Sequence, residues 1–247
     1  MKIAVISDIH GNLDALEEVL KDIKQEGCDK ILALGDYAMA GPEPSNTLDW
    51  FINNKENLNI EMIQGNTDYM IANYSEGLYR ELTEKAPVMS EALKDDFKSL
   101  NQTQKDFLKN LPVQKSIEID GVKILMVHGS PRRNNEDILP DTPMKDVEMM
   151  IKDVREDVIL CGHTHIPCGF QTPQKKTVVN VGSVGRPFTE EAKSCYLKIT
   201  ITNGKCVFEH RFVDYNKDRA ALKLRSREFT GANKLANTLL DPKLRHF

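Results

Sequence analysis

No apolar run in the sequence approaches the roughly 20 residues that a membrane-spanning helix requires. The amino-terminal run, residues 1–8, is too short for the apolar core of a signal peptide and ends on the charge of Asp8. These two absences argue against a membrane-spanning protein and against secretion. We therefore expect a soluble, cytoplasmic protein without a membrane partner.

Cysteine is scarce, and the five cysteines include no C-x-x-C pair. An odd set of this kind indicates neither a disulfide framework nor a cysteine zinc site. We expect ordinary reduced thiols at all five positions, which are Cys28, Cys161, Cys168, Cys195 and Cys206. The chain also lacks repeats and low-complexity segments, which argues against a solenoid.

A formal net charge of −4 argues against a general nucleic-acid binder, but the charge is unevenly distributed. Residues 217–247 contain eight Lys or Arg and three Asp or Glu, so this segment carries +5 and the preceding 216 residues carry −9. We expect one domain over residues 1–215 and a basic helix and tail over residues 216–247. The basic segment is either solvated, or it docks to an acidic partner or to a second copy of the chain in a homo-oligomer.

The first third of the chain alternates strands and helices. Residues 2–7, 30–34 and 60–63 are short apolar runs typical of buried strands. Apolar residues at helical spacing follow the first run and end before Gly27, and a second helix is expected from an N-cap at Ser45 to about residue 54. Three βα units predict a parallel core.

The remainder of the chain adds helices and then antiparallel strands. Residues 69–111 are predominantly helical in pattern, with candidate caps at Ser90 and Thr103. Asp120-Gly121 and Asn203-Gly204 each separate two strand-like runs, which predicts two hairpins. Residues 157–161 and 177–181 are further strands. We therefore expect an α/β fold of two packed mixed sheets with helices outside.

Polar side chains collect directly after these apolar strands. Carboxyl ends of strands in open α/β sheets are where ligands bind, so we expect these side chains to converge on one edge. Imidazole, carboxylate and amide together suit a transition metal such as zinc, manganese, iron or nickel. The seven candidate metal ligands are Asp8, His10, Asp36, Asn66, His128, His163 and His165.

The order of these motifs resembles that of the calcineurin-like metallophosphoesterases over residues 1 to about 213. The resemblance is carried by Asp8-x-His10, Gly35-Asp36, Gly65-Asn66, His128 and Gly162-His163-x-His165. A closer likeness is to small bacterial members, through Ser-Asp-Ile-His-Gly-Asn at residues 7–12, His-Gly-Ser-Pro at 128–131 and Val-Gly-Ser-Val-Gly at 181–185. His210 and His246 match no motif, and we expect them in a sheet or on the surface.

The resemblance implies a four-layer αββα sandwich that holds two divalent metal ions. Asp8, His10 and His165 would bind the first metal, and Asn66, His128 and His163 the second. Asp36 would bridge both, because a carboxylate can ligate each cation with one oxygen while it offsets their repulsion across roughly 3.5 to 4 Å.

The resemblance further implies hydrolysis of a small, possibly nucleotide-like, phosphoester by a metal-bridging hydroxide, without a protein nucleophile. Asp36, Asn66 and His128 are the expected catalytic residues. Asn12 either binds phosphate or only caps the first helix. The guanidinium groups of Arg132, Arg133 and Arg186 either clamp phosphate or lie solvated on the surface.

One position departs from the family pattern. Many members have His after the Asn of the third motif, where it can protonate the leaving oxygen, but this chain has Thr67. Thr cannot act as an acid near pH 7. A subset of the small bacterial members that this chain resembles also lacks this His and is associated with phosphodiester hydrolysis, so the resemblance implies a phosphodiesterase rather than an efficient monoesterase. Asp68, which follows, is expected only to cap the next helix.

Two alternative functions remain at this stage. The first is a phosphomonoesterase or phosphoprotein phosphatase, which leaving-group preference would distinguish from a diesterase. The second is a non-catalytic interaction scaffold of the same fold, for which eroded metal ligands would be expected. All seven ligand positions carry competent side chains here.

Overall fold

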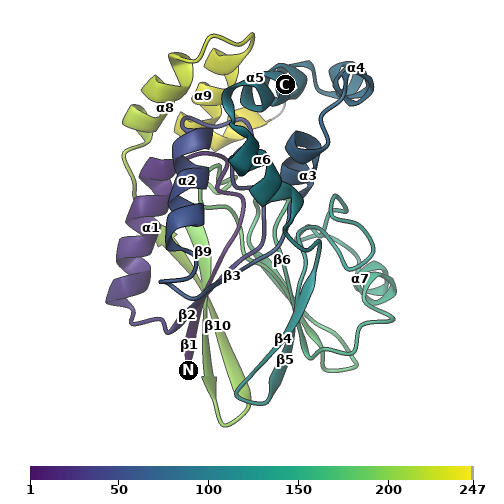
Figure 1. Cartoon of the computed structure of the whole chain (residues 1–247). Coiled ribbons are helices and arrows are strands. Elements are labelled where there is room, and N and C mark those ends of the chain that lie inside the picture. The colour runs from purple at the N-terminus through teal and green to yellow at the C-terminus, as the bar shows by residue number, and fades with distance from the viewer. Residues whose placement is uncertain (246–247) are drawn as a thin grey trace.

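The first of two five-stranded sheets is built from both ends of the chain. Its strand order is β10-β9-β1-β2-β3 in the computed structural model, which describes residues 1–245 (Figure 1). β1 pairs in parallel with β2, and β2 with β3, as the βα units predict. β9 runs antiparallel to β1 and forms a hairpin with β10. The strands are β1 (Lys2–Ile6), β2 (Lys30–Ala33), β3 (Ile60–Met62), β9 (Ser194–Thr202) and β10 (Lys205–Val213).

The second sheet comes from one continuous stretch of the chain, residues 115–180, in the order β4-β5-β6-β8-β7. Its centre, β5-β6-β8, is parallel, and the edge strands β4 and β7 are antiparallel. β7 was not expected from the sequence. The strands are β4 (Lys115–Ile119), β5 (Val122–Met126), β6 (Val158–Cys161), β7 (Cys168–Gln171) and β8 (Thr177–Asn180).

Helices cover the outer face of each sheet. In Figure 1 α1 (Leu13–Gln25) and α2 (Pro44–Asn54) lie along the first sheet and α7 (Met144–Met150) beside the second. Beyond the carboxyl ends of the strands lie α3 (Asn66–Ala72), α4 (Glu76–Lys85), α5 (Pro87–Ser99) and α6 (Gln102–Lys109). Within residues 1–245, no helix combines the length and apolar character needed to cross a bilayer.

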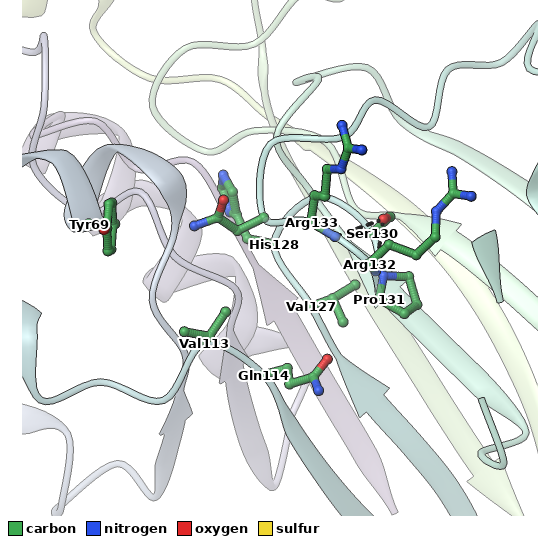
Figure 2. A pocket seen from close by; sticks show the side chains of 10 residues that line it. Tyr69, Val113, Gln114, Val127, His128, Ser130, Pro131, Arg132 and Arg133 are labelled. Carbon is green, nitrogen blue, oxygen red and sulfur yellow. Dashed lines mark hydrogen bonds between the residues drawn. The ribbon is translucent and has the colours of Figure 1, made fainter. Parts of the chain in front are cut away.

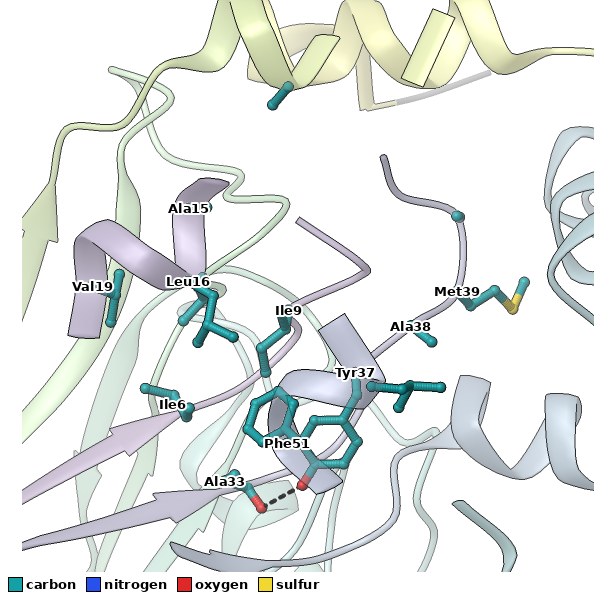
Figure 3. Packing of buried hydrophobic residues seen from close by; sticks show 14 of the residues in the cluster. Ile6, Ile9, Ala15, Leu16, Val19, Ala33, Tyr37, Ala38, Met39 and Phe51 are labelled. Atoms are coloured by element: carbon teal, nitrogen blue, oxygen red, sulfur yellow. Dashed lines mark hydrogen bonds between the residues drawn. The ribbon is translucent and has the colours of Figure 1, made fainter. Parts of the chain in front are cut away.

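Alternation of side chains along the strands creates the layers. In β1, Ile3 and Val5 face the second sheet, whereas Ala4 and Ile6 face the helices, because successive strand residues point to opposite faces. The helix-facing core includes Tyr37 and Phe51, and Figure 3 shows the Tyr37 hydroxyl donating to the Ala33 carbonyl. The expected αββα sandwich is confirmed, with one apolar layer between the sheets and one beneath each helical layer.

The sequence predicted the two hairpin turns correctly but placed several helix starts at the wrong residues. Asp120-Gly121 and Asn203-Gly204 join their strands with left-handed backbone at all four residues, as the expected hairpins require. The predicted cap at Ser45 is wrong, because α2 already starts at Pro44, whose fixed φ suits a first helical position. The caps at Ser90 and Thr103 are also wrong. α5 starts at Pro87, and Asn101 caps α6 by accepting a hydrogen bond from Gln104.

The basic C-terminal segment forms α8 (Lys217–Arg225), α9 (Ala232–Leu240) and a short 3₁₀ helix (Pro242–Arg245). Apolar residues of α8 and α9, such as Leu224 and Leu235, belong to the core cluster of the first sheet. On α8, Arg219 and Lys223 form ion pairs with Asp14 of α1. Much of the segment is therefore packed and paired within the domain, and its role in a homo-oligomer stays a prediction.

A single buried leucine can test the apolar layer between the sheets. Leu160 of β6 is fully buried there, whereas Leu222 of α8 is 67% exposed. We expect Leu160→Ala to lower the free energy of unfolding by about 2 to 5 kcal/mol, because it leaves a cavity. The matched Leu222→Ala change should stay within about 0.5 kcal/mol. Urea titration of both variants measures this, and equal losses would contradict the described layering.

Candidate metal centre

Turns after five strands meet at one edge of the molecule and are joined by backbone hydrogen bonds. The amide of Asp8 donates to Gly35 O at 3.0 Å, and that of His10 donates to Asp36 O at 2.9 Å. Within the second sheet, the Gly162 amide donates to His128 O at 2.7 Å, and between the sheets the amide of Gly185, which follows β8, donates to Asp8 O at 2.9 Å. The side chains that follow β1, β2, β5 and β6 are therefore held on a common backbone framework.

The backbone itself is strained where these side chains project. A left-handed conformation is uncommon outside glycine, although Asp and His adopt it more readily than most residues. Such conformations persist where the surrounding structure enforces them, and they cluster at functional sites. Five of the seven candidate ligands have positive φ values: Asp8 (55°), His10 (46°), Asp36 (57°), His163 (69°) and His165 (61°).

Two glycines allow the turns to approach the carboxylates. A Cβ atom at Gly65 would lie 2.0 Å from Asp36 Oδ1, and one at Gly162 would lie 2.5 Å from Asp8 Oδ2. Both distances are far below van der Waals contact, so any side chain at either position would displace the carboxylate. Glycine is thus required beside each buried aspartate.

One cluster of ligand atoms combines Asp8, His10 and His165. His165 Nε2 lies 3.2 Å from Asp8 Oδ1 and 3.1 Å from His10 Nε2. All three residues are buried. These are the residues that the resemblance assigns to the first metal.

A second cluster shares Asp8 with the first and adds Asp36 and His128. His128 Nε2 lies 3.3 Å from Asp36 Oδ2 and 3.0 Å from Asn66 Oδ1. Asp36 Oδ2 is also 3.8 Å from His10 Nε2, so this carboxylate faces both clusters. The structure therefore brings together six of the seven predicted ligands.

The imidazoles are oriented by backbone carbonyl groups. Nδ1 of His10 donates to Met39 O, Nδ1 of His128 to Leu34 O and Nδ1 of His165 to Arg186 O, each at 2.7 Å. A carbonyl can only accept, so each ring carries its proton on Nδ1 and, when neutral, directs a lone pair on Nε2 into the cluster. Asp8 Oδ1 is buried without a hydrogen-bond partner among the described residues. Converging lone pairs and an orphaned carboxylate oxygen fit a cation.

His163 lies beside the clusters rather than within them. Its Nε2 is 3.3 Å from Asp137 Oδ1, its ring centroid is 5.4 Å from that of His128, and its amide donates to Asp8 Oδ2 at 3.0 Å. Asp137 was not singled out from the sequence, because no motif marks it. The assignment of His163 to the second metal stays a prediction.

Asp68 does more than cap α3. Its carboxylate accepts hydrogen bonds from the amides of Gly65, Asp36 and Tyr37 at 2.7 to 3.0 Å, which joins the second and third motifs. Burial, with the nearby charge of Asp36, raises the pKa of Asp68 to about 7. Thr67 contributes its amide, which donates to Asp36 Oδ1 at 2.9 Å. Its buried hydroxyl has no hydrogen-bond partner among the described residues.

The loop that carries Met39 O is joined to the C-terminal part of the chain. Asp96 of α5 accepts from the Ala40 amide at 2.8 Å and from Arg227 at 2.7 Å, and Arg227 donates to Gly41 O at 2.6 Å. Arg227 follows α8. Arg227, which lies 186 positions after Gly41 in the sequence, thus helps to support the loop whose Met39 carbonyl group orients His10.

The expected substrate-binding residues occupy different environments. Asn12 caps α1 by accepting from the Ala15 amide, and its Nδ2 donates to Gly185 O at 2.8 Å. Arg132 is exposed and paired with Glu136. Arg186 is buried rather than solvated, and burial lowers its pKa to about 10. Substrate contacts of all three stay predictions.

Neither of the two histidines outside the motifs belongs to a ligand cluster of the described residues. His210 lies in β10, and its Nε2 donates to Asn180 O at 2.7 Å, which agrees with a sheet residue. His246 lies outside the described residues.

Comparison with known proteins identifies the family. Residues 1–204 match the calcineurin-like phosphoesterase superfamily domain. The chain belongs to this family. The family is metal-dependent and its members hydrolyse phosphate esters, so the clustered ligand atoms of this calcineurin-like phosphoesterase agree with metal binding.

Individual relatives agree with this membership. An uncharacterized protein of Methanocaldococcus jannaschii is 30% identical over 234 residues, which cover 85% of this chain and 83% of the relative. A hypothetical protein of Pyrococcus horikoshii superposes with a TM-score of 0.85 at 24% identity, over 95% of this chain and 97% of its own. A metallophosphoesterase of Sphaerobacter thermophilus gives a TM-score of 0.78 at 24% identity, over 98% and 99% of the two chains. The two structures show the shared fold.

The electrostatics of the site predict that metal binding releases protons. Burial alone would lower the pKa of His128, but Asp36 and Asp8 outweigh burial and raise the pKa to about 10. Near pH 7.5 the ring of the metal-free protein is therefore charged, and it must lose its proton to ligate. We expect release of about one proton from this ring on binding, and an affinity that rises with pH up to about 10.

Calorimetric titration with Mn²⁺ in buffers of different ionisation enthalpy measures this release. His210→Gln, which changes a histidine outside the site, should leave the proton count unchanged, whereas His128→Asn should reduce it. Binding heats that do not depend on the buffer would contradict the charged state of His128.

Proposed function

We propose that this chain is a metal-dependent phosphodiesterase that holds two divalent transition-metal ions, drawn from manganese, iron, zinc and nickel. The observation that carries the proposal is the pair of adjacent ligand clusters, which share Asp8 and are both faced by Asp36. Three imidazoles already present Nε2 to these clusters. The arrangement supports a binding site for two cations more directly than it supports a scaffold without turnover.

When bound, divalent cations would neutralise phosphoryl oxygens and activate water for attack on phosphorus. The residues of this chain would hold the cations and position them. Asp8, His10 and His165 would hold one cation, and Asn66, His128 and His163 the other, with Asp36 between them. No serine or cysteine nucleophile is needed.

Preference for diesters over monoesters rests on Thr67. The position that carries an imidazole in many family members holds a buried hydroxyl here, and the amide of this residue is used on Asp36. An alkyl hydroxyl is too weak an acid to transfer its proton near neutral pH, so the leaving oxygen receives no general-acid help from this position. The proposal therefore favours substrates whose leaving group departs as a stable anion.

Metal stoichiometry tests the two-cation site. We expect about two metal equivalents in the reconstituted wild type, loss of both in Asp36→Ala, and loss of chiefly one in Asn66→Ala, because Asp36 faces both clusters whereas Asn66 lies beside the second. Asp153→Ala, which removes an exposed carboxylate on the same chain, should retain two. Elemental analysis of folded, dialysed protein is the measurement. One equivalent in wild type of full activity would refute the proposal.

A leaving-group series tests the role of Thr67. A positioned general acid contributes about 10²- to 10⁴-fold, so we expect aryl diesters to be cleaved far faster than matched alkyl diesters. Thr67→His should narrow this difference where its ring reaches the leaving oxygen, and Thr67→Gln, of similar size but without an acid, should not. The measurement is kcat/KM across the series at saturating metal.

A flat wild-type series, under conditions in which the chemical step limits the rate, would show that another group supplies the proton. Faster cleavage of alkyl monoesters than of aryl diesters would instead favour a monoesterase.

A further inference from the structure

A cavity of about 460 Å³ opens beside the second ligand cluster. Figure 2 shows His128 near its centre, Tyr69 on one side, and Arg132 and Arg133 on the other. Its lining residues come from α3, from the segment before β4 and from the turn after β5: Tyr69, Val113, Gln114, Val127, His128, Ser130, Pro131, Arg132, Arg133 and Asn134.

The cavity adjoins one end of the metal centre. His128 forms part of its wall and also contributes Nε2 to the second cluster. Tyr69 lies three residues after Asn66 on α3, and residues at this spacing share a helix face. A group bonded to a phosphorus atom at the clusters would therefore extend from His128 and Asn66 toward the tyrosine ring.

The cavity is lined by aromatic, aliphatic, amide and basic side chains but not by acidic ones. None of its ten residues is an aspartate or glutamate, although the chain as a whole is acidic. Tyr69 is 50% exposed and Val113 is 55% exposed, so an aromatic face and an aliphatic side chain are open to a ligand. Gln114 and Asn134 supply amide donors and acceptors.

The side chains of Arg132 and Arg133 differ in whether they form an ion pair. Arg132 is paired with Glu136, whereas Arg133 enters no ion pair among residues 1–245. The backbone of Arg133 is nevertheless fixed, because its carbonyl accepts from the Ser130 amide at 2.8 Å and its amide donates to Ser130 Oγ at 3.3 Å. An anchored turn thus carries an exposed guanidinium group at the rim of the cavity, near the charge of Glu136 but not in an ion pair with it.

We infer that this cavity binds the larger organic arm of the diester, and that this arm carries an aromatic ring and a second anionic group, as a nucleotide does. The ring stacks on Tyr69, which provides a face that accepts any base. The second anion pairs with Arg133, whose planar fork suits phosphate or carboxylate. This inference rests on the proposed phosphodiesterase function and names its substrate class.

Three diesters with the same p-nitrophenyl leaving group separate the contribution of the aromatic ring from that of the second anionic group. Their second arms are methyl, thymidine 5′-yl, and thymidine 5′-yl with a 3′-phosphate, so a ring and then an anion are added to a constant reaction. We expect kcat/KM to rise at each step, chiefly through KM, because the arm binds away from the reacting bonds. Higher ionic strength should reduce the gain in kcat/KM from the added phosphate more than the gain from the added ring, because salt screens charged pairs.

Variants assign each gain to its residue. Tyr69→Ala should remove about 5- to 100-fold from the gain given by the ring, while Tyr69→Phe, which keeps the ring, should retain most of it. Arg133→Gln should remove about 10-fold from the gain given by the anion. Arg80→Gln, which removes an exposed charge on α4 outside the cavity, should match wild type with all three substrates.

Two outcomes distinguish this inference from the function on which it rests. Equal kcat/KM for all three diesters in an active enzyme overturns the assignment of the cavity and leaves the diesterase intact. If the metal-loaded protein cleaves none of them, the proposed function fails. Calorimetric titration with thymidine 3′,5′-bisphosphate then tests whether the cavity binds a nucleotide. Binding that weakens in Tyr69→Ala and Arg133→Gln supports the assignment, and absence of binding to wild type overturns it.

Discussion

Two buried carboxylates, Asp8 and Asp36, lie at neighbouring strand ends, and the structure around them depends on keeping them there. Burial and mutual repulsion both oppose the charged forms of such a pair. His165 and His128 outweigh burial and hold the pKa of Asp8 well below its usual range, and His128 does the same for Asp36, whose pKa falls to about 2. The imidazoles and carboxylates therefore stabilise one another, and a cation at their centre would complete the charge balance.

Rigidity at this edge comes from the backbone. Left-handed conformations at five ligand positions would relax if the turns were free, so the hydrogen bonds between turns have to hold them. Glycine beside each carboxylate lets the turns pack without a gap, and carbonyl groups fix three rings. The same restraint extends to the cavity by way of the Ser130–Arg133 turn, so the ligand clusters and the cavity share one framework.

The sequence was informative where a signal is local and periodic. Alternation, glycine turns and polar residues after apolar strands predicted the two sheets, the hairpins and the convergence of the ligands. The sequence was uninformative where the hydrogen-bond partner of a side chain is a backbone group far away in the sequence. Nothing in residues 39–41 indicates that Met39 O orients His10, and Asp68 was expected only to cap a helix. Caps failed for a related reason, because Ser45 and Thr103 are good capping residues whose neighbours Pro44 and Asn101 start the helices first.

Support for His10 from Arg227 has a consequence for the order in which the protein is made. The first two ligands, Asp8 and His10, leave the ribosome early, but β9, which pairs with β1, spans residues 194–202, and the Arg227–Asp96–Ala40 contacts come later still. A nascent chain can form its parallel βα units well before it can hold His10 in its final orientation. The two ligand clusters therefore reach their final geometry only after residue 227 has been made, although Asp8 and His10 are synthesised before the other candidate ligands.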